Sequence, residues 1–344
     1  MSAAIQADLR NQVETMSRGQ MTVRFTNKGQ PSFFYRLKKF TLDSLGAGFG
    51  TGTHPAFIVD GVEKDEILIG AHQAAELDGE MVSQAGRVPR ASINHDDAVT
   101  LARNTGAGFC VATNAMYAAV ALSARAAGRF PRGNNDDGRA YNALDEWGID
   151  DNGNPTEGGG ATVIRAGSGP VAWNYPPTPF GIQNLNGNVW EWSPGQRTVG
   201  GEIQIIPDND AVMAATDLSA TGPWQAIDAA TGALVAPGTA GTVRYATSGT
   251  ADGTLVCSSG SEFSSMVAHG VSETAQQKLK ALGLMQPGAP LEQDGFYISL
   301  SGERLPIRGG SWGSGSRAGV FALALSNARS FASAHIGFRP AFVI

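Results

Sequence analysis

Residues 305–344 read LPIRGGSWGSGSRAGVFALALSNARSFASAHIGFRPAFVI, and this stretch contains two kinds of position. The first kind is apolar, glycine or arginine, the residue types that hold a backbone in place. The second kind is interleaved with the first and is small, polar or of mixed chemistry, so no backbone requirement explains it. This alternation predicts a rigid scaffold that presents a surface, with function on that surface. The scaffold positions are Arg308, Gly309, Gly310, Val320, Phe321, Leu323, Leu325, Ile336, Gly337, Phe338 and Arg339.

The surface positions, together with one aromatic residue, form the predicted ligand-binding site. Trp312 has two interpretations, a core residue or a fixed aromatic at the centre of the site. We favour the second because an aromatic ring gives a large contact area at low entropic cost. Arg329 and Arg339 are expected to bond carbonyls or carboxylates inside the scaffold rather than a ligand. The predicted ligand-binding residues are Ser311, Trp312, Gly313, Ser314, Ser316, Arg317, Ala324, Ser326, Asn327, Phe331, Ser333, Ala334 and His335.

The composition indicates a globular chain with many turns. Of its 344 residues, 45 are glycine, 42% are hydrophobic and only 16% are charged. The net charge is −6 and no basic stripe is present, which argues against nucleic acid or an anionic membrane as partner. Residues 1–19 lack the apolar core of a signal peptide, and no run reaches the ~18 apolar residues of a membrane span. We therefore expect no ordinary export and no membrane insertion, as for a virion component or a cytoplasmic protein.

The two cysteines, Cys110 and Cys257, show no paired spacing. A disulfide between them is open, but the apolar run around Cys110 favours a small buried hydrophobe. No Cys/His cluster with the spacing of a metal site is present.

Periodicity and turn residues predict the elements that precede the C-terminal segment. A helix is expected over residues 3–17, and a helical pair follows, the first capped by Ser92 or Asn94 and ending at Gly106, the second starting after 113–114 and ending at Gly128. Residues 198–300 are rich in Gly, Ala and Thr and, apart from a helix near 273–282, indicate a long insertion rather than a second domain with its own core. Strands are expected at 21–25, 32–37, 40–42, 56–59 and 66–70.

The segment NLNGNVWEW, residues 184–192, has two interpretations. Two tryptophans around one carboxylate fit a strand that buries one face, after a tight Asn/Gly turn. An Asn side chain, two backbone carbonyls and the carboxylate of Glu191 would give four oxygen ligands to calcium. The alternative, which we favour, is a metal-free turn in which Asn and Glu satisfy backbone donors.

The motifs GNVWEW, RGGSW and GFRPA, in this order, resemble the formylglycine-generating enzyme family, a variant of the C-type lectin fold. The similarity covers roughly residues 88–197 and 300–344, including the helical pair. The family's calcium motif matches at Asn184, Gly187, Val189 and Glu191, so the resemblance implies a structural calcium. The copper-binding cysteines of the enzymes fall at Ser314 and Gly319, which offer no thiolate. We therefore expect no oxidase activity and no required cofactor.

The pattern RGGSW-x-x-G-x-x-AGVFAL-x-L-x-x-AR-S-x-x-x-x-x-IGFRPAF is similar to the variable region of diversity-generating retroelement proteins. The N-terminal segments GQPSFFYRLKKF and HPAFIVDGVEKDEI resemble phage-borne members of that family. In that family, copying errors at template adenines diversify mainly Asn codons. The positions implied to vary coincide with the surface positions defined above on chemistry alone, with Asn327 as an unaltered one.

Together these observations predict one α+β domain over residues 1–344, a formylglycine-generating-enzyme-like C-type lectin fold with a long insertion. Its parts are the N-terminal strands (1–60), the helical pair and GNVWEW core (88–197), the insertion (198–300) and the variable region (301–344). The predicted function is recognition of a protein or glycan on a target cell by a phage or viral tail-associated adhesin. Two alternatives stay open: a lectin that is not diversified, and an oxidase of the formylglycine-generating type. The ligand and the oligomeric state are not specified by these patterns.

Overall fold

The computed structural model describes residues 2–160 and 162–343 of the chain. Each α-helix in these ranges begins at a Ser, Thr or Asn whose side-chain oxygen accepts a hydrogen bond from a backbone N–H of the first turn. The two predicted helices of the central pair are confirmed, and Asn94 is the cap of the first. The helices are α1 (Ala3–Met16), α2 (His95–Thr105), α3 (Asn114–Ala126) and α4 (Glu273–Ala281).

An antiparallel sheet joins the two ends of the chain. Its strand order is β1-β2-β5-β26-β8, so the last strand lies inside the sheet rather than at its edge. Ala341 on β26 pairs with Ile69 on one side and with Cys110 on the other. The C-terminal segment is therefore fixed at its far end. The strands are β1 (Met21–Phe25), β2 (Pro31–Lys38), β5 (Glu66–Gly70), β8 (Phe109–Val111) and β26 (Pro340–Phe342).

A larger mixed sheet carries the rest of the C-terminal segment. Its main path is β20-β22-β24-β23-β14-β15-β18-β19-β21, and β13 pairs with β23 on one side and β25 on the other. The strands around the C-terminal segment are β13 (Trp190–Trp192), β22 (Gly295–Ile298), β23 (Glu303–Gly309), β24 (Gly319–Asn327) and β25 (Ile336–Phe338). The others are β14 (Gln196–Val199), β15 (Glu202–Ile205), β16 (Gln225–Ile227), β17 (Leu234–Val235), β18 (Arg244–Ala246), β19 (Thr254–Val256), β20 (Ser261–Glu262) and β21 (Val267–His269).

Short hairpins and single 3-10 turns fill the connections. The hairpin strands are β3 (Ile58–Val59), β4 (Val62–Glu63), β6 (Ala75–Leu77), β7 (Glu80–Val82), β9 (Arg139–Ala140), β10 (Ala143–Trp147), β11 (Asn174–Tyr175) and β12 (Ile182–Gln183). The 3-10 turns are Leu42–Leu45, Pro55–Phe57, Val171–Trp173, Asp210–Val212, Phe263–Ser265 and Gly315–Arg317.

Two predicted strands differ from the structure. Residues 40–42 make only an isolated bridge, between Thr41 and Thr53, before a 3-10 turn begins at Leu42. Of residues 56–59, the first two belong to a 3-10 turn started by Pro55, and only Ile58–Val59 is strand. In both places a local turn competes with the apolar pattern, because proline sets the φ angle for a turn and glycines surround the segment.

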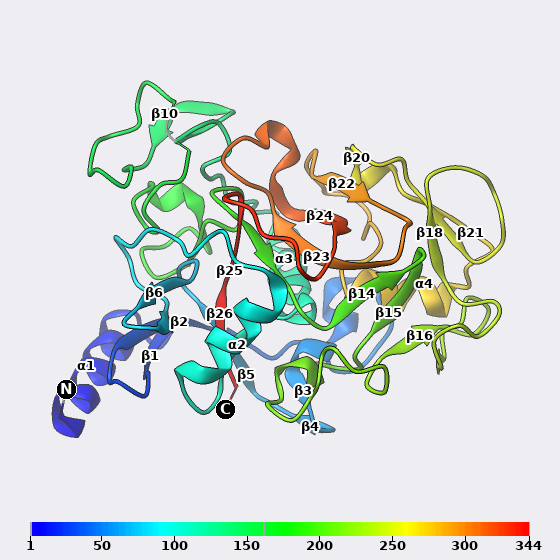
Figure 1. The fold of residues 1–344 in the computed structure, drawn as a ribbon, viewed down its shortest axis with the longest axis horizontal. Coiled ribbons are helices and arrows are strands. Elements are labelled where there is room, and N and C mark those ends of the chain that lie inside the picture. Colours follow the sequence, from blue (N-terminus) through cyan, green and yellow to red (C-terminus); the bar gives the residue numbers. More distant parts are fainter. Residues whose placement is uncertain (1, 161, 344) are drawn as a thin grey trace.

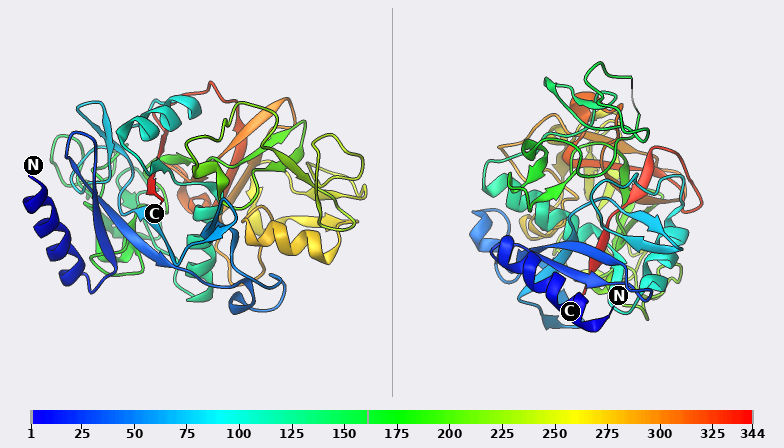
Figure 2. Two further views of the ribbon diagram at one scale, coloured as in Figure 1. Left: turned by 90° about the horizontal axis from the view of Figure 1, so that it is seen from below. Right: turned by 90° about the vertical axis from the view of Figure 1, so that its left-hand side faces the viewer.

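The main hydrophobic core surrounds α3, in which Met116, Val120 and Leu122 are at most 1% exposed. Residues of the 198–300 segment, among them Ile203 and Phe263, pack in the same cluster. This segment and α1 lie at opposite ends of the molecule, and the C-terminal strands lie between them (Figures 1 and 2). The observed mixture of helices and sheets confirms the predicted α+β class. No helix within residues 2–160 and 162–343 has the length and apolar content needed to cross a bilayer.

Candidate functional site

A hollow of about 390 Å³ opens over the C-terminal strands. The predicted surface positions that line it come from three stretches of sequence: the loop after β23, the end of β24 and the loop before β25. Eight of the thirteen predicted residues line this one hollow, and their binding role stays a prediction. These eight are Gly313, Ser314, Ala324, Ser326, Asn327, Phe331, Ser333 and His335.

Four further residues line the hollow from the scaffold, and none of them is among the predicted ligand-binding residues: Trp190, Tyr297, Ile307 and Ile336. Strand pairing brings them together. Ala324 on β24 pairs with Tyr297 on one side and Ile307 on the other, and Trp190 pairs with Ile336. The rings of Trp190 and Tyr297 meet edge to face, with centroids 6.1 Å apart and planes at 87°. The hollow therefore combines an aromatic pair with small and polar side chains.

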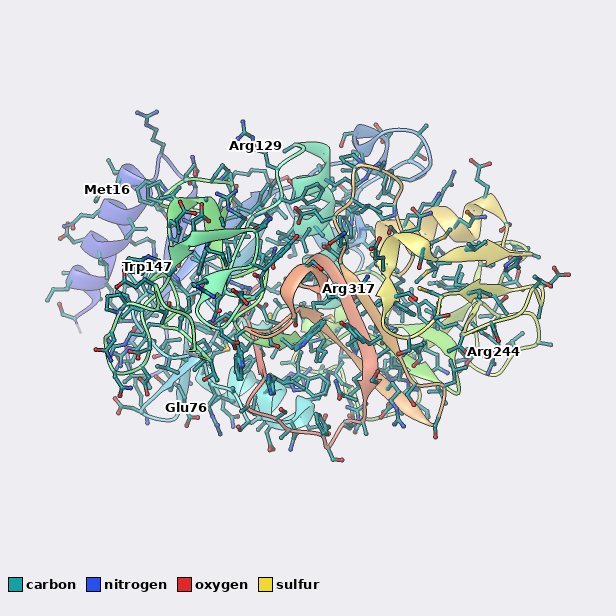
Figure 3. All side chains as sticks on the ribbon, turned by 90° about the horizontal axis from the view of Figure 1, so that it is seen from above. Met16, Glu76, Arg129, Trp147, Arg244 and Arg317 are labelled. Carbon is teal, nitrogen blue, oxygen red and sulfur yellow. The ribbon has the colours of Figure 1, made fainter. Side chains whose placement is uncertain are left out.

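The other five predicted residues lie outside the lining of the hollow. Ser311 and Trp312 are buried, at 5% and 7% exposed, whereas Ala334 is exposed. Ser316 and Arg317 lie on the 3-10 turn Gly315–Arg317, and the Arg317 guanidinium is 3.6 Å from the Glu262 carboxylate. Figure 3 shows Arg317 near the middle of the molecule, between Met16 at one end and Arg244 at the other.

Trp312 is a buried residue, the first of the two interpretations made from its sequence position, and its role at the centre of the site stays a prediction. Its ring is largely buried, yet it stacks on the ring of His335, with centroids 4.3 Å apart and an angle of 26° between planes. Its backbone N–H donates to the Asn188 carbonyl at 3.1 Å, and its carbonyl accepts from Asp137 at 2.8 Å. Trp312 is therefore a fixed element under a predicted variable residue.

Backbone hydrogen bonds, rather than side chains, fix most of the two loops. In the first loop, Gly315 N–H donates to the Asn135 carbonyl at 2.8 Å, in addition to the two bonds of Trp312. In the second loop, the Ser333 and His335 carbonyls accept from the N–H groups of Ser92 and Trp190, at 3.0 and 2.8 Å. Because backbone groups are the same for every residue type except proline, these bonds survive a change of side chain.

Three exceptions involve the side chains of predicted variable residues. Ser314 Oγ accepts from the Ser311 N–H at 2.9 Å and lies 3.4 Å from Ser311 Oγ, and Ser333 Oγ accepts from the His335 N–H at 3.3 Å. All three are hydrogen bonds within a turn. Their loss is worth only about 1 kcal/mol each.

The scaffold arginines bond within the protein, as predicted. Arg339 donates to both oxygens of the Glu191 carboxylate, at 2.8 and 2.6 Å, and both side chains are 1% exposed. Arg329 donates to the carboxylates of Glu303 and Asp96. Arg308 donates to Asn114 Oδ1 at 2.6 Å and to the Gly283 carbonyl at 2.8 Å. The first bond fixes β23 to the start of α3, and the second fixes it to the turn that follows α4.

Asp294 supports the scaffold from beneath. Asp294 directly precedes β22, and its Oδ2 accepts from the N–H of Phe321 on β24 at 2.6 Å. Burial raises the pKa of this carboxyl to about 8. The group is therefore largely protonated at neutral pH, and a buried charge is avoided.

The predicted calcium motif forms a tight, fully buried turn. Asn184 and Asn188 both have positive φ, at 55° and 64°. The expectation that β13 buries only one face is wrong, because Glu191 and Trp192 are both buried. The Glu191 carboxylate is paired with the guanidinium of Arg339, which directly follows β25. The carbonyls of Asn184, Gly187 and Val189 and the Glu191 carboxylate converge on one atom, Nε2 of Gln73.

This arrangement does not fit a calcium ion between the four oxygens, because the Gln73 amide nitrogen lies at the point where they converge, 2.9–3.4 Å from each. Elsewhere within residues 2–160 and 162–343, no group of three His, Cys, Asp or Glu side chains is arranged to hold a metal ion.

The two cysteines lie away from the hollow. Both are free and buried, Cys110 on β8 and Cys257 after β19, so the disulfide alternative is wrong. Burial raises the pKa of Cys110 to about 12 and raises that of Cys257 above its ordinary value. A protonated, buried thiol is a poor nucleophile and a poor metal ligand.

Comparison with protein families assigns the fold. The model of the sulfatase-modifying factor enzyme 1-like domain, FGE-sulfatase, matches residues 7–212. The chain belongs to the FGE-sulfatase family. The match confirms the predicted formylglycine-generating-enzyme-like C-type lectin fold, and it begins well before residue 88, where the motif resemblance begins.

No curated protein matches the chain. Among solved structures, Treponema denticola variable protein 1 is similar at 12% sequence identity with a TM-score of 0.37, over 94% of this chain and 98% of that chain.

Membership of the FGE-sulfatase family raises the question of catalysis, because the family includes enzymes. The positions that match the enzymatic cysteines are Ser314, on the rim of the hollow, and Gly319, the first residue of β24. A Cβ at Gly319 would lie 2.0 Å from Asp294 Oδ1, so the backbone packs against this carboxyl where a cysteine side chain would have to fit.

Proposed function

We propose that this protein binds a ligand in the hollow over β24, and that a retroelement diversifies the residues of the hollow. The observation that carries the proposal is the separation of roles in the two loops. Backbone N–H and C=O groups fix the loops to the start of α2, to β13 and to Asn135, Asp137 and Asn188, while side chains of eight predicted positions line the hollow. A binding surface that varies in sequence needs this separation, because folding must tolerate each new set of side chains.

The motif resemblance of residues 305–344 to retroelement variable regions supports diversification. Apolar scaffold residues of that motif are buried: Val320, Phe321, Leu323, Leu325 and Phe338 are at most 1% exposed. Phe331, by contrast, is 46% exposed although it is aromatic. An exposed aromatic beside a hollow is typical of a binding contact.

The carrier and partner follow from the same resemblance. We propose a phage or other virus as carrier, with the protein on the tail, because segments near the N-terminus resemble phage-borne members. The partner is then a protein or glycan on the target cell surface. Labelled protein incubated with a panel of candidate host cells tests this, and binding to none of them while a virion protein fraction lacks the chain contradicts it.

A display library tests the proposed function. One library randomises Gly313, Ser326, Phe331, Ser333 and His335, and the matched library randomises five buried scaffold positions: Val320, Phe321, Leu323, Leu325 and Phe338. We expect most members of the first library to fold and some to bind new ligands. Few members of the second should fold. Equal loss of folding in both libraries contradicts the proposal.

A lectin that is not diversified is the second candidate function. The Trp190 and Tyr297 rings beside serine and asparagine groups are the kind of surface on which sugar rings stack. A glycan array, probed with and without chelator, separates the two: binding to one glycan class that Trp190→Ala abolishes favours the lectin.

We further propose that the chain is not a catalyst. The family's thiol positions are Ser314 and Gly319, and the two cysteines are buried elsewhere. Stoichiometric copper binding together with thiol-dependent oxygen consumption by the purified protein would contradict this.

A further inference from the structure

The buried turn Asn184–Glu191 directs four oxygens at one point. The Gln73 Nε2 atom lies 2.9 Å from the Val189 carbonyl, 2.9 Å from Glu191 Oε1, 3.3 Å from the Gly187 carbonyl and 3.4 Å from the Asn184 carbonyl. An amide nitrogen has two hydrogens, so it satisfies the two nearer oxygens by hydrogen bonds and the two farther ones by electrostatic attraction only. Four oxygens around one centre are the arrangement that proteins offer to a cation.

The orientation of the Gln73 amide is set by its other end. Its Oε1 accepts from Asn188 Nδ2 at 2.8 Å. Asn188 is oriented in turn, because its Oδ1 accepts from the Ile164 N–H at 2.9 Å and from Asn134 Nδ2 at 3.1 Å. If the Gln73 amide were flipped, its Oε1 would face the four oxygens of the turn, which are all acceptors. Its Nε2 would then face Asn188 Nδ2, which is also a donor. The hydrogen-bond network therefore directs the nitrogen, with its partial positive charge, at the oxygens.

The charge of the turn is already balanced without a metal. Glu191 carries the negative charge, and the Arg339 guanidinium binds both of its oxygens while also donating to the carbonyls of Gly70 and Gln183. A divalent cation beside Glu191 would lie next to the buried guanidinium, which repels it. The side chains of Gln73, Glu191 and Arg339 are at most 1% exposed, so water screens this repulsion little.

We infer that the carboxamide of Gln73 takes the place of a divalent cation in this turn, so that the fold and the surface above it need no calcium. Gln73 is a positioning residue: it fixes the Val189 carbonyl and the Glu191 carboxylate, and β13 then places Trp190 at the hollow. The inference does not depend on diversification or on the identity of the ligand.

Calcium titration of the purified wild-type chain tests the inference directly. We expect no stoichiometric heat in isothermal titration calorimetry with calcium chloride, and the same melting temperature in millimolar calcium and in millimolar EDTA. One bound calcium per chain, or a rise of several degrees in calcium over EDTA, overturns the inference.

Two substitutions of Gln73 supply the converse test. Gln73→Ala removes the nitrogen, and Gln73→Glu offers the turn a second carboxylate. We expect both variants to melt well below the wild type in EDTA. Gln73→Glu alone should recover several degrees in calcium, because its added carboxylate offsets the repulsion from the Arg339 guanidinium. Gln84→Ala is the matched control, since Gln84 donates to a single carbonyl, that of Pro31, at 2.8 Å. It should gain no calcium response.

The variants can also count against the inference. A Gln73→Ala variant that melts with the wild type in EDTA shows that the amide does not hold the turn, and this outcome overturns the assignment. If either variant fails to fold, the wild-type calcium titration still decides the question.

Discussion

The ring of Trp312 lies against the ring of His335, with centroids 4.3 Å apart, although 22 residues of sequence separate them. Trp312 is 7% exposed and is fixed by backbone hydrogen bonds to Asn188 and Asp137, whereas His335 is exposed. The pair joins the two loops that border the hollow. A buried, fixed aromatic thus supports an exposed side chain that is predicted to vary.

Substitution of three predicted contact residues should change binding but not folding. We expect Phe331→Ala, Arg317→Ala and His335→Ala to weaken binding to a captured ligand or target cell. The affinity should fall by about tenfold where the residue makes a strong contact. Their melting temperatures should stay within roughly 2 °C of the wild type, because surface substitutions change stability by only about 0.5 kcal/mol. Surface plasmon resonance and scanning fluorimetry on the same samples measure both. Loss of the fold in these variants would show that the residues are structural.

Tyr297 should matter to every diversified version of the protein. It comes from the scaffold strand β22, lines the hollow and meets Trp190 edge to face. Tyr297→Ala removes a fixed contact, so we expect weaker binding, by about tenfold, in several versions that differ at residues 313–335. Tyr297→Phe keeps the ring and serves as the control. Versions that bind equally well with alanine at this position would exclude Tyr297 from the site.

Arg308 should be required for stability rather than for binding. Arg308→Leu leaves Asn114 Oδ1 and the Gly283 carbonyl without their donor in the core, at a cost of about 3–5 kcal/mol. Burial lowers the pKa of this guanidinium to about 10, so it is still charged at neutral pH. Urea denaturation measures the change, with the surface variant Arg244→Leu as comparison. A change below about 1 kcal/mol would mean that Arg308 does not anchor β23.

Stability should fall on acidification because of His54. This ring is buried, with Nδ1 accepting from the Ala56 N–H and Nε2 bonding the Ala281 carbonyl, and burial lowers its pKa to about 4. The unfolded chain binds a proton at this residue below pH ~6.5 and the folded chain does not, so stability is full above that pH and falls as pH drops toward 4.

The contribution of His54 is at most about 1.4 kcal/mol per pH unit in that window. His54→Gln should reduce the pH dependence of the unfolding free energy between pH 6.5 and 4, while His72, whose pKa burial also lowers to about 4, keeps its own share. An unchanged slope in His54→Gln would show that His54 is not protonated differently in the folded and unfolded chains.

The sequence predicts much of the fold because local signals agree there with tertiary packing. Asn94 and Thr113 are caps that start the helical pair, and the apolar scaffold residues of 305–344 are buried as their type requires. Residues 40–42 were mispredicted because their strand-like pattern yields to a local turn. Helix caps and the burial of apolar residues are signals that a single sequence shows without a structure.

The rest of the site depends on contacts between distant segments. Tyr297 lies in the 198–300 stretch, which carries no binding motif, and only its pairing with Ala324 brings it to the hollow. Gln73 belongs to no motif, and it lies more than a hundred residues from the turn that it fixes. Neither position has a signal in its own neighbourhood, so a single sequence could not reveal its role.

Sequencing the 3′ end of this gene across its natural population tests the central claim most directly. The account predicts substitutions concentrated at the surface positions between Ser311 and His335, scaffold codons such as those of Phe321 and Arg339 unchanged, and a near-identical template copy beside a reverse transcriptase gene. A uniform sequence with no template copy would contradict diversification and leave a fixed binding protein of the same fold.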